Sequence, residues 1–171
     1  MNLNRTFIFG GTGSGKTTLA MKMSTILKIP FYTTDNFVYK KTGWSEKYPE
    51  KVRDKNLKIA FSKKKWIIEG VHKGEWIYPA FKKSTYVVIL IMPRHKTLKR
   101  VIVREIQRLI KREREKTKLR DFWMLLKLAY AYKNDYFLSH QQLVKDFKKE
   151  FIILHSNKEI LAFLTKMGDI K

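Results

Sequence analysis

A glycine-rich segment near the start of the chain has the composition of a phosphate-binding loop. It consists of Gly10, Gly11, Thr12, Gly13, Ser14, Gly15, Lys16 and Thr17, followed by Thr18, and it matches the pattern G-x-x-x-x-G-K-[ST] in full. Glycines let the backbone curl around a phosphate, and the N–H groups of the loop then point at the anion. Lys16 is placed to reach the β- and γ-phosphates, and the Thr17 hydroxyl is placed to ligate Mg²⁺. The segment therefore predicts a P-loop that binds ATP with Mg²⁺.

Two other interpretations of the same glycines account for less of the sequence. A flexible turn would not need the apolar stretch 6–9 before the loop or the helical pattern 17–27 after it. A dinucleotide site of the G-x-G-x-x-G type would leave Lys16 and Thr17 unexplained. The strand–loop–helix context favours the P-loop.

The elements that would position this loop follow from the hydrophobic pattern. Short apolar runs alternate with longer segments of helical period, which indicates a parallel α/β sheet. Strands are expected at 6–9, 30–32, 66–69, 86–92 and 151–154, and a short amphipathic helix closes the chain. We therefore predict one domain over residues 1–171, with a P-loop NTPase fold and a five-stranded parallel sheet flanked by helices.

The charge of the chain is strongly positive, since 37 Lys and Arg face 15 Asp and Glu and give a net charge of +22. Such a field attracts nucleotides, nucleic acid or acidic surfaces, although a solvated basic surface explains it equally well. There is no cysteine, which excludes disulfides and fits a reducing compartment. Signal-like segments are not seen, and the apolar stretches 86–93 and 122–132 are too short to span a bilayer. We expect a cytoplasmic protein without a membrane partner.

A second cluster of charge lies in the segment 94–120, which holds twelve Lys or Arg against three Glu. Arg100, Arg104 and Arg108 are spaced four residues apart and fall within an arc of about 80° on a helix. An apolar stripe lies roughly opposite and consists of Leu98, Val101, Ile102, Ile106 and Leu109. We predict that the stripe is buried and that the arginines project from the other face. The segment could grip a polyanionic acceptor or be a solvated helix.

The order of these features resembles that of the adenylate-kinase-like P-loop kinases, and most closely that of the DNA topology modulation (FlaR-like) proteins. The landmarks are 10–18, Thr34-Asp35 with Gly43-Trp44, 66–70, and Pro93-Arg94 with Leu98, Arg100 and Arg104. The resemblance covers nearly the whole chain. It implies a nucleotide-kinase-like core, an acceptor-side insert at about 35–62 and a basic helical lid at about 94–120.

The resemblance also implies roles for two acidic residues. Glu69 stands where these kinases carry an Asp-Gly pair that orients Mg²⁺, commonly through water, and its extra methylene leaves direct metal contact open. Asp35 follows the second strand, where it would hold an acceptor hydroxyl or act as a general base. An ordinary strand-end carboxylate is the alternative for Glu69, and a helix N-cap is the alternative for Asp35.

In the same scheme Arg100 and Arg104 neutralise the transferring phosphoryl group, whereas Arg108 belongs to a solvated surface. The loop 155–158 would border the adenine. The four histidines, His72, His95, His140 and His155, show no metal-ligand spacing.

Together these residues predict an ATP-dependent phosphotransferase that acts on a small, nucleotide-like or other acceptor. Its catalytic residues would be Lys16, Asp35, Arg100 and Arg104, with Mg²⁺ held by Thr17 and Glu69. One alternative is a nucleic-acid-binding protein that uses ATP as a switch, and another is a P-loop ATPase without an acceptor. Any nucleic-acid binding by the kinase is expected to be weak and non-specific.

Overall fold

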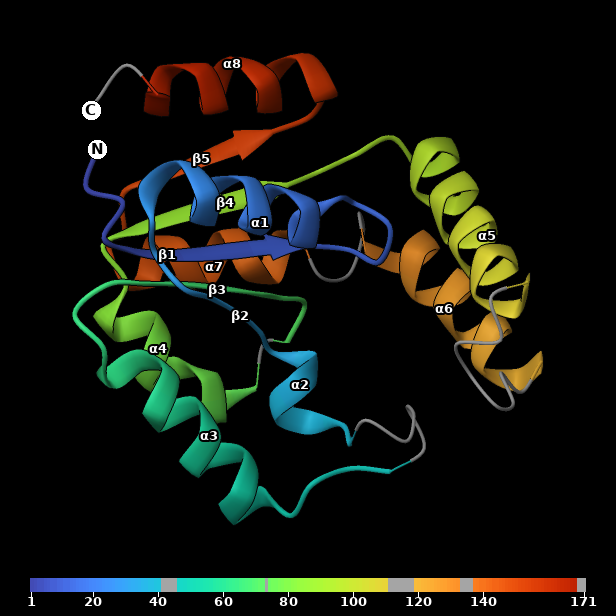
Figure 1. The fold of residues 1–171 in the computed structure, drawn as a ribbon, viewed down its shortest axis with the longest axis horizontal. Coiled ribbons are helices and arrows are strands. Elements are labelled where there is room, and N and C mark those ends of the chain that lie inside the picture. Colours follow the sequence, from blue (N-terminus) through green and yellow to red (C-terminus); the bar gives the residue numbers. More distant parts are fainter. Residues whose placement is uncertain (41–45, 73, 111–118, 133–136, 169–171) are drawn as a thin grey trace.

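The sheet of the protein has five parallel strands, as the sequence predicts. The computed structural model describes residues 1–40, 46–72, 74–110, 119–132 and 137–168. The strands are β1 (Arg5–Gly10), β2 (Phe31–Thr33), β3 (Trp66–Gly70), β4 (Tyr86–Leu90) and β5 (Phe151–Leu154). Their order is β2-β3-β1-β4-β5, and every neighbouring pair is parallel. β1 is therefore central, and the loop that follows it opens at the middle of one edge of the sheet (Figure 1).

Helices connect and cover the strands. They are α1 (Lys16–Leu27), α2 (Asp35–Val38), α3 (Glu50–Ser62), the 3-10 turn η1 (Glu75–Ile77), α4 (Tyr78–Lys83), α5 (Arg94–Ile110), α6 (Leu119–Ala131), α7 (Phe137–Asp146) and α8 (Asn157–Gly168). The predicted helix 17–27 and the predicted closing helix are confirmed as α1 and α8. None of the helices in the described residues is long and apolar enough to cross a bilayer.

Side chains alternate between the two faces of the sheet along each strand, and helices bury both faces. One apolar cluster joins strand residues Phe7, Phe9, Trp66, Ile68, Val87 and Ile89 to α3, α4 and α7. The opposite cluster joins Ile8, Ile67, Val88 and Leu90 to α1 and α8. Parallel sheets need this double cover, and the central strands accordingly read as continuous apolar runs.

The strand register brings polar residues together at the carboxyl edge of the sheet. Glu69 on β3 pairs with Ile8 of β1 on one side and with Thr33 of β2 on the other. The P-loop follows β1 at the same edge. Residues that are distant in sequence therefore meet beside the loop.

Helices α5 and α6 pack against each other at this carboxyl edge (Figure 1). Val101 of α5 and Leu125 and Ala129 of α6 form a small buried cluster. The predicted orientation of α5 is wrong in part, because Ile102 is 39% and Ile106 is 49% exposed. The side that carries the arginines is turned inward instead, where a buried carboxylate and backbone carbonyls accept hydrogen bonds from their guanidinium groups.

The two segments predicted as insert and lid correspond to α2 and α3, and to α5 with the first residues of α6. The landmark Gly43-Trp44 and residues 111–118 of the predicted lid lie outside the described residues.

Candidate functional site

The P-loop takes the conformation that its glycines allow. Gly13 and Gly15 have φ values of 77° and 95°, in the region that side chains resist. The turn is closed by a 3.1 Å hydrogen bond from the Ser14 N–H to the Gly11 carbonyl. Helix α1 begins directly after the loop at Lys16, so the open N–H groups of its first turn face the loop. A helix N-terminus behind a glycine loop is suited to hold a phosphate.

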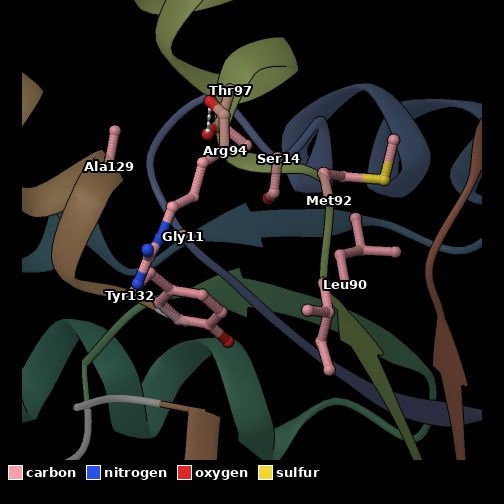
Figure 2. A pocket seen from close by; sticks show the side chains of 9 residues that line it. Gly11, Ser14, Leu90, Met92, Arg94, Thr97, Ala129 and Tyr132 are labelled. Atoms are coloured by element: carbon pink, nitrogen blue, oxygen red, sulfur yellow. Dashed lines mark hydrogen bonds between the residues drawn. The ribbon is translucent and has the colours of Figure 1, made fainter. Parts of the chain in front are cut away.

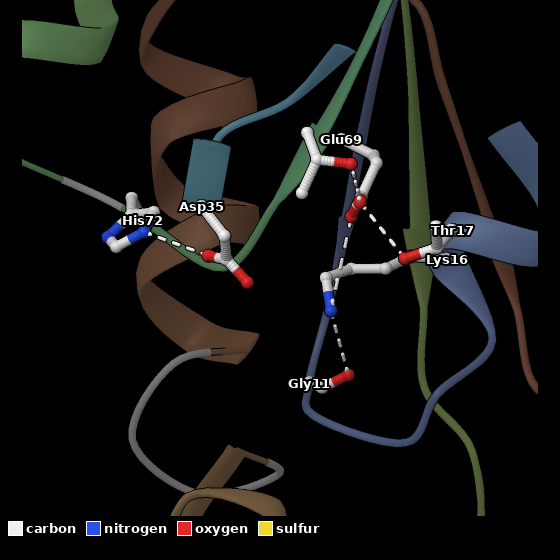
Figure 3. A network of polar contacts seen from close by, with 7 residues as sticks. Gly11, Lys16, Thr17, Asp35, Glu69 and His72 are labelled. Carbon is white, nitrogen blue, oxygen red and sulfur yellow. Dashed lines mark hydrogen bonds and ion pairs between the residues drawn. The ribbon is translucent and has the colours of Figure 1, made fainter. Parts of the chain in front are cut away.

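Lys16 crosses the mouth of the loop. Its Nζ lies 3.5 Å from the Gly11 carbonyl oxygen and 4.0 Å from Oε2 of Glu69 (Figure 3). The positive charge therefore sits between the P-loop backbone and a carboxylate on the neighbouring strand.

Glu69 is fully buried and links three segments of the chain. Its Oε1 accepts hydrogen bonds from the Thr17 hydroxyl at 2.9 Å and from the Thr33 hydroxyl at 2.8 Å. Because Thr17 donates its proton to Glu69, the lone pairs of its oxygen remain available for a cation. Sequence reasoning found Thr17 and Glu69 but missed Thr33, whose only signal is its position at the end of β2.

The oxygen atoms at this point fit Mg²⁺. Glu69 Oε2 is buried and makes no hydrogen bond within the described part of the chain. Those residues contain no group of three His, Cys, Asp or Glu that could hold a metal by themselves. Mg²⁺ usually takes one or two protein oxygens and completes its shell with phosphate and water. Thr17 and Glu69 supply such a partial set beside the phosphate loop.

Asp35 is oriented by a histidine and does not cap a helix. Thr34 occupies the N-cap position of α2, where no side-chain capping bond forms, so the capping alternative for Asp35 is wrong. Oδ1 of Asp35 instead lies 3.2 Å from Nε2 of His72, and in the view of Figure 3 His72 is on the side away from Lys16. The His72 ring packs on Trp76 with 5.5 Å between centroids. His72 was not assigned a role from the sequence, since nothing in its neighbourhood marks it.

The backbone near Asp35 is held against β3. The Thr34 N–H donates to the Glu69 carbonyl at 2.8 Å, and a Cβ on Gly70 would overlap the Thr34 side chain. Burial raises the pKa of Tyr39 above its ordinary value, and the charge of Asp35 adds to this rise. The Asp35 carboxylate is thus fixed a short way along the same edge of the sheet as Glu69.

Arg100 holds the outer wall of the P-loop. Its Nη1 donates to the carbonyls of Ser14 at 3.1 Å and Gly13 at 3.4 Å, and its Nη2 donates to Oδ1 of Asn157 at 2.9 Å. Both ends of the guanidinium group are therefore engaged by the protein. The bond to Asn157 brings the predicted adenine loop 155–158 to the P-loop.

Arg104 and Arg108 share one carboxylate. Oε1 of Glu105 accepts from Arg104 Nε at 3.2 Å and from Arg108 Nη1 at 2.8 Å. The predicted surface role of Arg108 therefore does not describe its position, since its guanidinium group is bonded to a buried acid. Burial, followed by the charge of Arg108, lowers the pKa of Arg104, while Glu105 and Asp35 act in the opposite direction.

The P-loop is backed by the end of α6. A Cβ on Gly11 would come within 2.6 Å of the Tyr132 ring. The Tyr132 hydroxyl lies 3.1 Å from Nδ1 of His140, whose ring stacks on Phe9 of β1 at 4.0 Å. Burial raises the pKa of Tyr132 above its ordinary range. In the sequence, 122–132 stands out only as an apolar stretch too short to span a bilayer, because an aromatic residue carries no signal of long-range contact.

A small pocket lies between the P-loop, the end of β4 and helices α5 and α6 (Figure 2). Its lining consists of Gly11, Ser14, Leu90, Ile91, Met92, Arg94, Thr97, Ala129 and Tyr132. The Arg94 guanidinium group stacks over the Tyr130 ring at 4.4 Å. The mostly apolar lining and the contact of Arg94 with the Tyr130 ring indicate that this region joins α5 and α6 to the core.

Comparison with known proteins identifies the fold. No protein-family model and no curated protein sequence matches the chain. Solved structures do match, with coverage of nearly the whole chain. The shikimate kinase from Acinetobacter baumannii in complex with shikimate superimposes with a TM-score of 0.60 at 18% identity, over 99% of this chain and 93% of that chain.

Two further shikimate kinases give similar results. The enzyme from Bacteroides thetaiotaomicron has a TM-score of 0.55 at 15% identity, over 97% of each chain. The enzyme from Aquifex aeolicus has a TM-score of 0.52 at 18% identity, also over 97% of each chain. At these identities the likeness establishes the fold alone, and the protein has the fold of the shikimate-kinase-like P-loop kinases. The resemblance to the FlaR-like family stays a prediction.

Proposed function

We propose that the protein is an ATP-dependent phosphotransferase that transfers the γ-phosphoryl group of MgATP to a small acceptor. The observation that carries this proposal is the meeting, at one edge of the sheet, of a complete phosphate loop and an oriented carboxylate, Asp35. A nucleotide-binding switch needs the loop and one carboxylate for Mg²⁺, the place of Glu69, but it has no need of a second acid oriented toward an acceptor. The kinase fold of the solved neighbours agrees with this chemistry.

The residues of the loop would bind the donor. The backbone N–H groups of 10–17 and Nζ of Lys16 would hold the phosphates. Thr17 and Glu69 would hold Mg²⁺, which when bound neutralises phosphate charge and orients the donor. Arg100 would keep the loop wall in shape and border the base, and Arg104 would meet the transferring group. A cytoplasmic location belongs to the proposal because MgATP is the donor.

Asp35 would act on the acceptor. Its Oδ1 is bonded to His72, which leaves Oδ2 to accept a proton or hydrogen bond from an acceptor hydroxyl. The acceptor class in this proposal is a small molecule that carries a hydroxyl or phosphate group, as in the FlaR-like and adenylate-kinase-like resemblance. Shikimate belongs among the candidates because one neighbour was solved with it.

The experiment is a screen for ADP release above the acceptor-free rate. The panel contains nucleoside monophosphates, nucleosides, shikimate and small polyols, each with MgATP and the full chain. Lys16→Ala is the negative control and Lys22→Ala, an exposed lysine on the same helix, is its matched control. Acceptor-dependent ADP release that is lost only in Lys16→Ala supports the proposal.

Other outcomes favour the alternatives. Fast ATP hydrolysis that no acceptor stimulates would identify an ATPase. Failure of the wild-type chain to bind MgATP or MgADP would refute the P-loop assignment itself.

A further inference from the structure

Helix α5 contains a buried acid that the proposed reaction does not yet use. Glu105 is only 2% exposed, and a carboxylate is costly to bury unless cations pair with it. Its partners are Arg104 and Arg108, which both bond to Oε1. Oε2 is also buried and makes no hydrogen bond within the described residues. The carboxylate therefore serves two arginines through one oxygen.

The bond to Arg104 is made through Nε, which leaves the other end of the guanidinium group open. No hydrogen bond to the two terminal amino groups of Arg104 is found in the described part of the chain. A guanidinium group is planar and rigid, so a bond at Nε sets the directions in which both terminal groups point. Glu105 thus binds Arg104 at Nε and leaves its two terminal amino groups without a hydrogen bond to the described residues.

Arg104 lies on the part of α5 that follows the contact with the P-loop, and it is within electrostatic reach of Asp35. Helix α5 packs directly on the loop, since a Cβ on Gly13 would come within 2.5 Å of the Thr97 carbonyl, and Arg100 bonds the loop carbonyls. Arg104 is one turn further along, about 6 Å on the helix axis. Asp35 is near enough to act on the electrostatics of Arg104.

Arg108 completes the arrangement by its charge. One carboxylate beside one arginine would cancel the positive charge that a phosphoryl group needs. With two arginines and one carboxylate the cluster keeps a net charge of +1, and Arg108 occupies the remaining direction of Oε1. In the sequence alone, Arg104, Glu105 and Arg108 are indistinguishable from the other charged residues of a basic helix.

We propose that Glu105 is a positioning residue that fixes the guanidinium plane of Arg104, so that its two terminal amino groups face the γ-phosphoryl group of the bound triphosphate. The inference rests on the proposed function, and it assigns a task to a residue that would not touch the substrate. It predicts that substitution of Glu105 lowers the affinity for the triphosphate and leaves the affinity for the diphosphate unchanged.

The test measures nucleotide affinity, so it needs no acceptor. Isothermal titration of the full chain gives Kd for MgADP and for Mg²⁺ with the non-hydrolysable triphosphate AMP-PNP. The wild type should prefer the triphosphate. Arg104→Ala and Glu105→Met should each reduce this preference by about tenfold or more, the loss expected for a charge-assisted hydrogen bond. MgADP affinity should stay within about twofold, as in the exposed control Gln107→Met.

Two further variants separate positioning from structure. Glu105→Gln keeps an acceptor oxygen and should retain most of the preference, and Arg104→Ala/Glu105→Met should be no worse than Arg104→Ala alone. If Glu105→Met does not fold, Glu105→Asp serves in its place: the shorter side chain keeps the charge but withdraws the carboxylate from Nε of Arg104, so the preference should fall if Glu105 positions that guanidinium group.

The outcomes are distinct. A folded Glu105→Met that keeps the wild-type preference overturns the inference, and so does a wild type that binds the two nucleotides equally. A wild type that binds neither nucleotide refutes the proposed function, and the inference with it.

Discussion

The hydroxyl of Thr17 and the carboxylate of Glu69 are joined by a 2.9 Å hydrogen bond between Oγ1 and Oε1. The same Oε1 accepts a second hydrogen bond, of 2.8 Å, from Thr33. One oxygen atom therefore ties the first turn of α1 to the end of β2 across β3. Two of the three residues that meet here, Thr17 and Glu69, are the predicted ligands of Mg²⁺.

Glu69→Gln should weaken the use of Mg²⁺. The amide keeps the shape and one acceptor oxygen, but it removes the negative charge beside Thr17 and Lys16. We expect the apparent Mg²⁺ affinity in the presence of ATP to fall by about 10- to 100-fold. Titration of Mg²⁺ against nucleotide binding measures the effect.

Thr33→Val, which removes the other hydroxyl that bonds to Glu69, is the matched control and should change Mg²⁺ affinity far less. Equal Mg²⁺ affinity in Glu69→Gln and wild type would show that Glu69 is an ordinary strand-end carboxylate.

Asp35→Asn should spare MgATP binding and lower the acceptor-dependent rate by about 100-fold or more, as expected for loss of a general base. Thermal unfolding should change little, because Asp35 does not cap α2. Asp54→Asn, an exposed acid on α3, is the control. The measurement is ADP release with the acceptor found in the screen. An unchanged acceptor-dependent rate would remove Asp35 from the mechanism.

Arg100→Ala should act on nucleotide affinity and not on the transfer step. The variant loses the bonds that hold the carbonyls of Gly13 and Ser14 and the side chain of Asn157. We expect Kd to rise about tenfold for MgADP and for Mg²⁺ with AMP-PNP alike. Titration calorimetry with Lys99→Ala as control compares the two nucleotides. A lower kcat at unchanged nucleotide affinity would instead support the role predicted from the sequence, in which Arg100 neutralises the transferring phosphoryl group.

Glu159 gives the loop after β5 a stability that depends on pH. The His155 N–H and then the Ser156 hydroxyl hold the pKa of Glu159 below its ordinary value of 4.5. A carboxyl group whose pKa is lower in the folded protein stabilises it above the unfolded-state pKa, and this contribution is lost as the pH falls through the folded-state pKa. Glu159→Gln should therefore lower Tm at pH 7 and have a smaller effect at pH 3. Melting curves of both chains over this range test the sign, and a difference that grows toward low pH would contradict it.

The net charge of +22 should give weak binding of nucleic acid without sequence preference. Each phosphate that the protein neutralises releases counterions, so log affinity should fall steeply and linearly with log salt. Fluorescence anisotropy with labelled single- and double-stranded oligonucleotides, with and without MgATP, measures both dependences. Binding should largely vanish near physiological salt and be insensitive to ATP. Submicromolar binding that persists at physiological salt and responds to ATP would favour the alternative of a nucleic-acid-binding protein that uses ATP as a switch.

The fold was predictable because its signals are local. Every expected strand is present within two residues of its expected bounds, and the glycine pattern located the loop. Apolar runs and a contiguous motif can be read without knowledge of the neighbours. The order of the strands could not be read in this way, because it depends on contacts between distant segments.

The orientation of α5 shows where local reasoning ends. A count of apolar residues placed Ile102 and Ile106 inside, whereas the structure exposes them and turns the arginines inward. The reason is that Arg100 donates hydrogen bonds to carbonyls of the P-loop, and Arg104 donates one to the buried carboxylate of Glu105. Thr33 and His72 were missed for the same reason, since each gains its place at the site only through a partner far along the chain.

The contact between Gly11 and Tyr132 has a consequence for how this sequence can vary over time. The general P-loop pattern accepts any residue after its first glycine, but here a side chain at position 11 would strike the Tyr132 ring. Because the Cβ atom of Tyr132 is itself only 2.7 Å away, substitution of Gly11 is compatible with the fold only where the backbone at position 132 also lies further from the loop, or where that residue is glycine. Related chains should show the two positions changing together, although one lies in the nucleotide loop and the other at the end of α6.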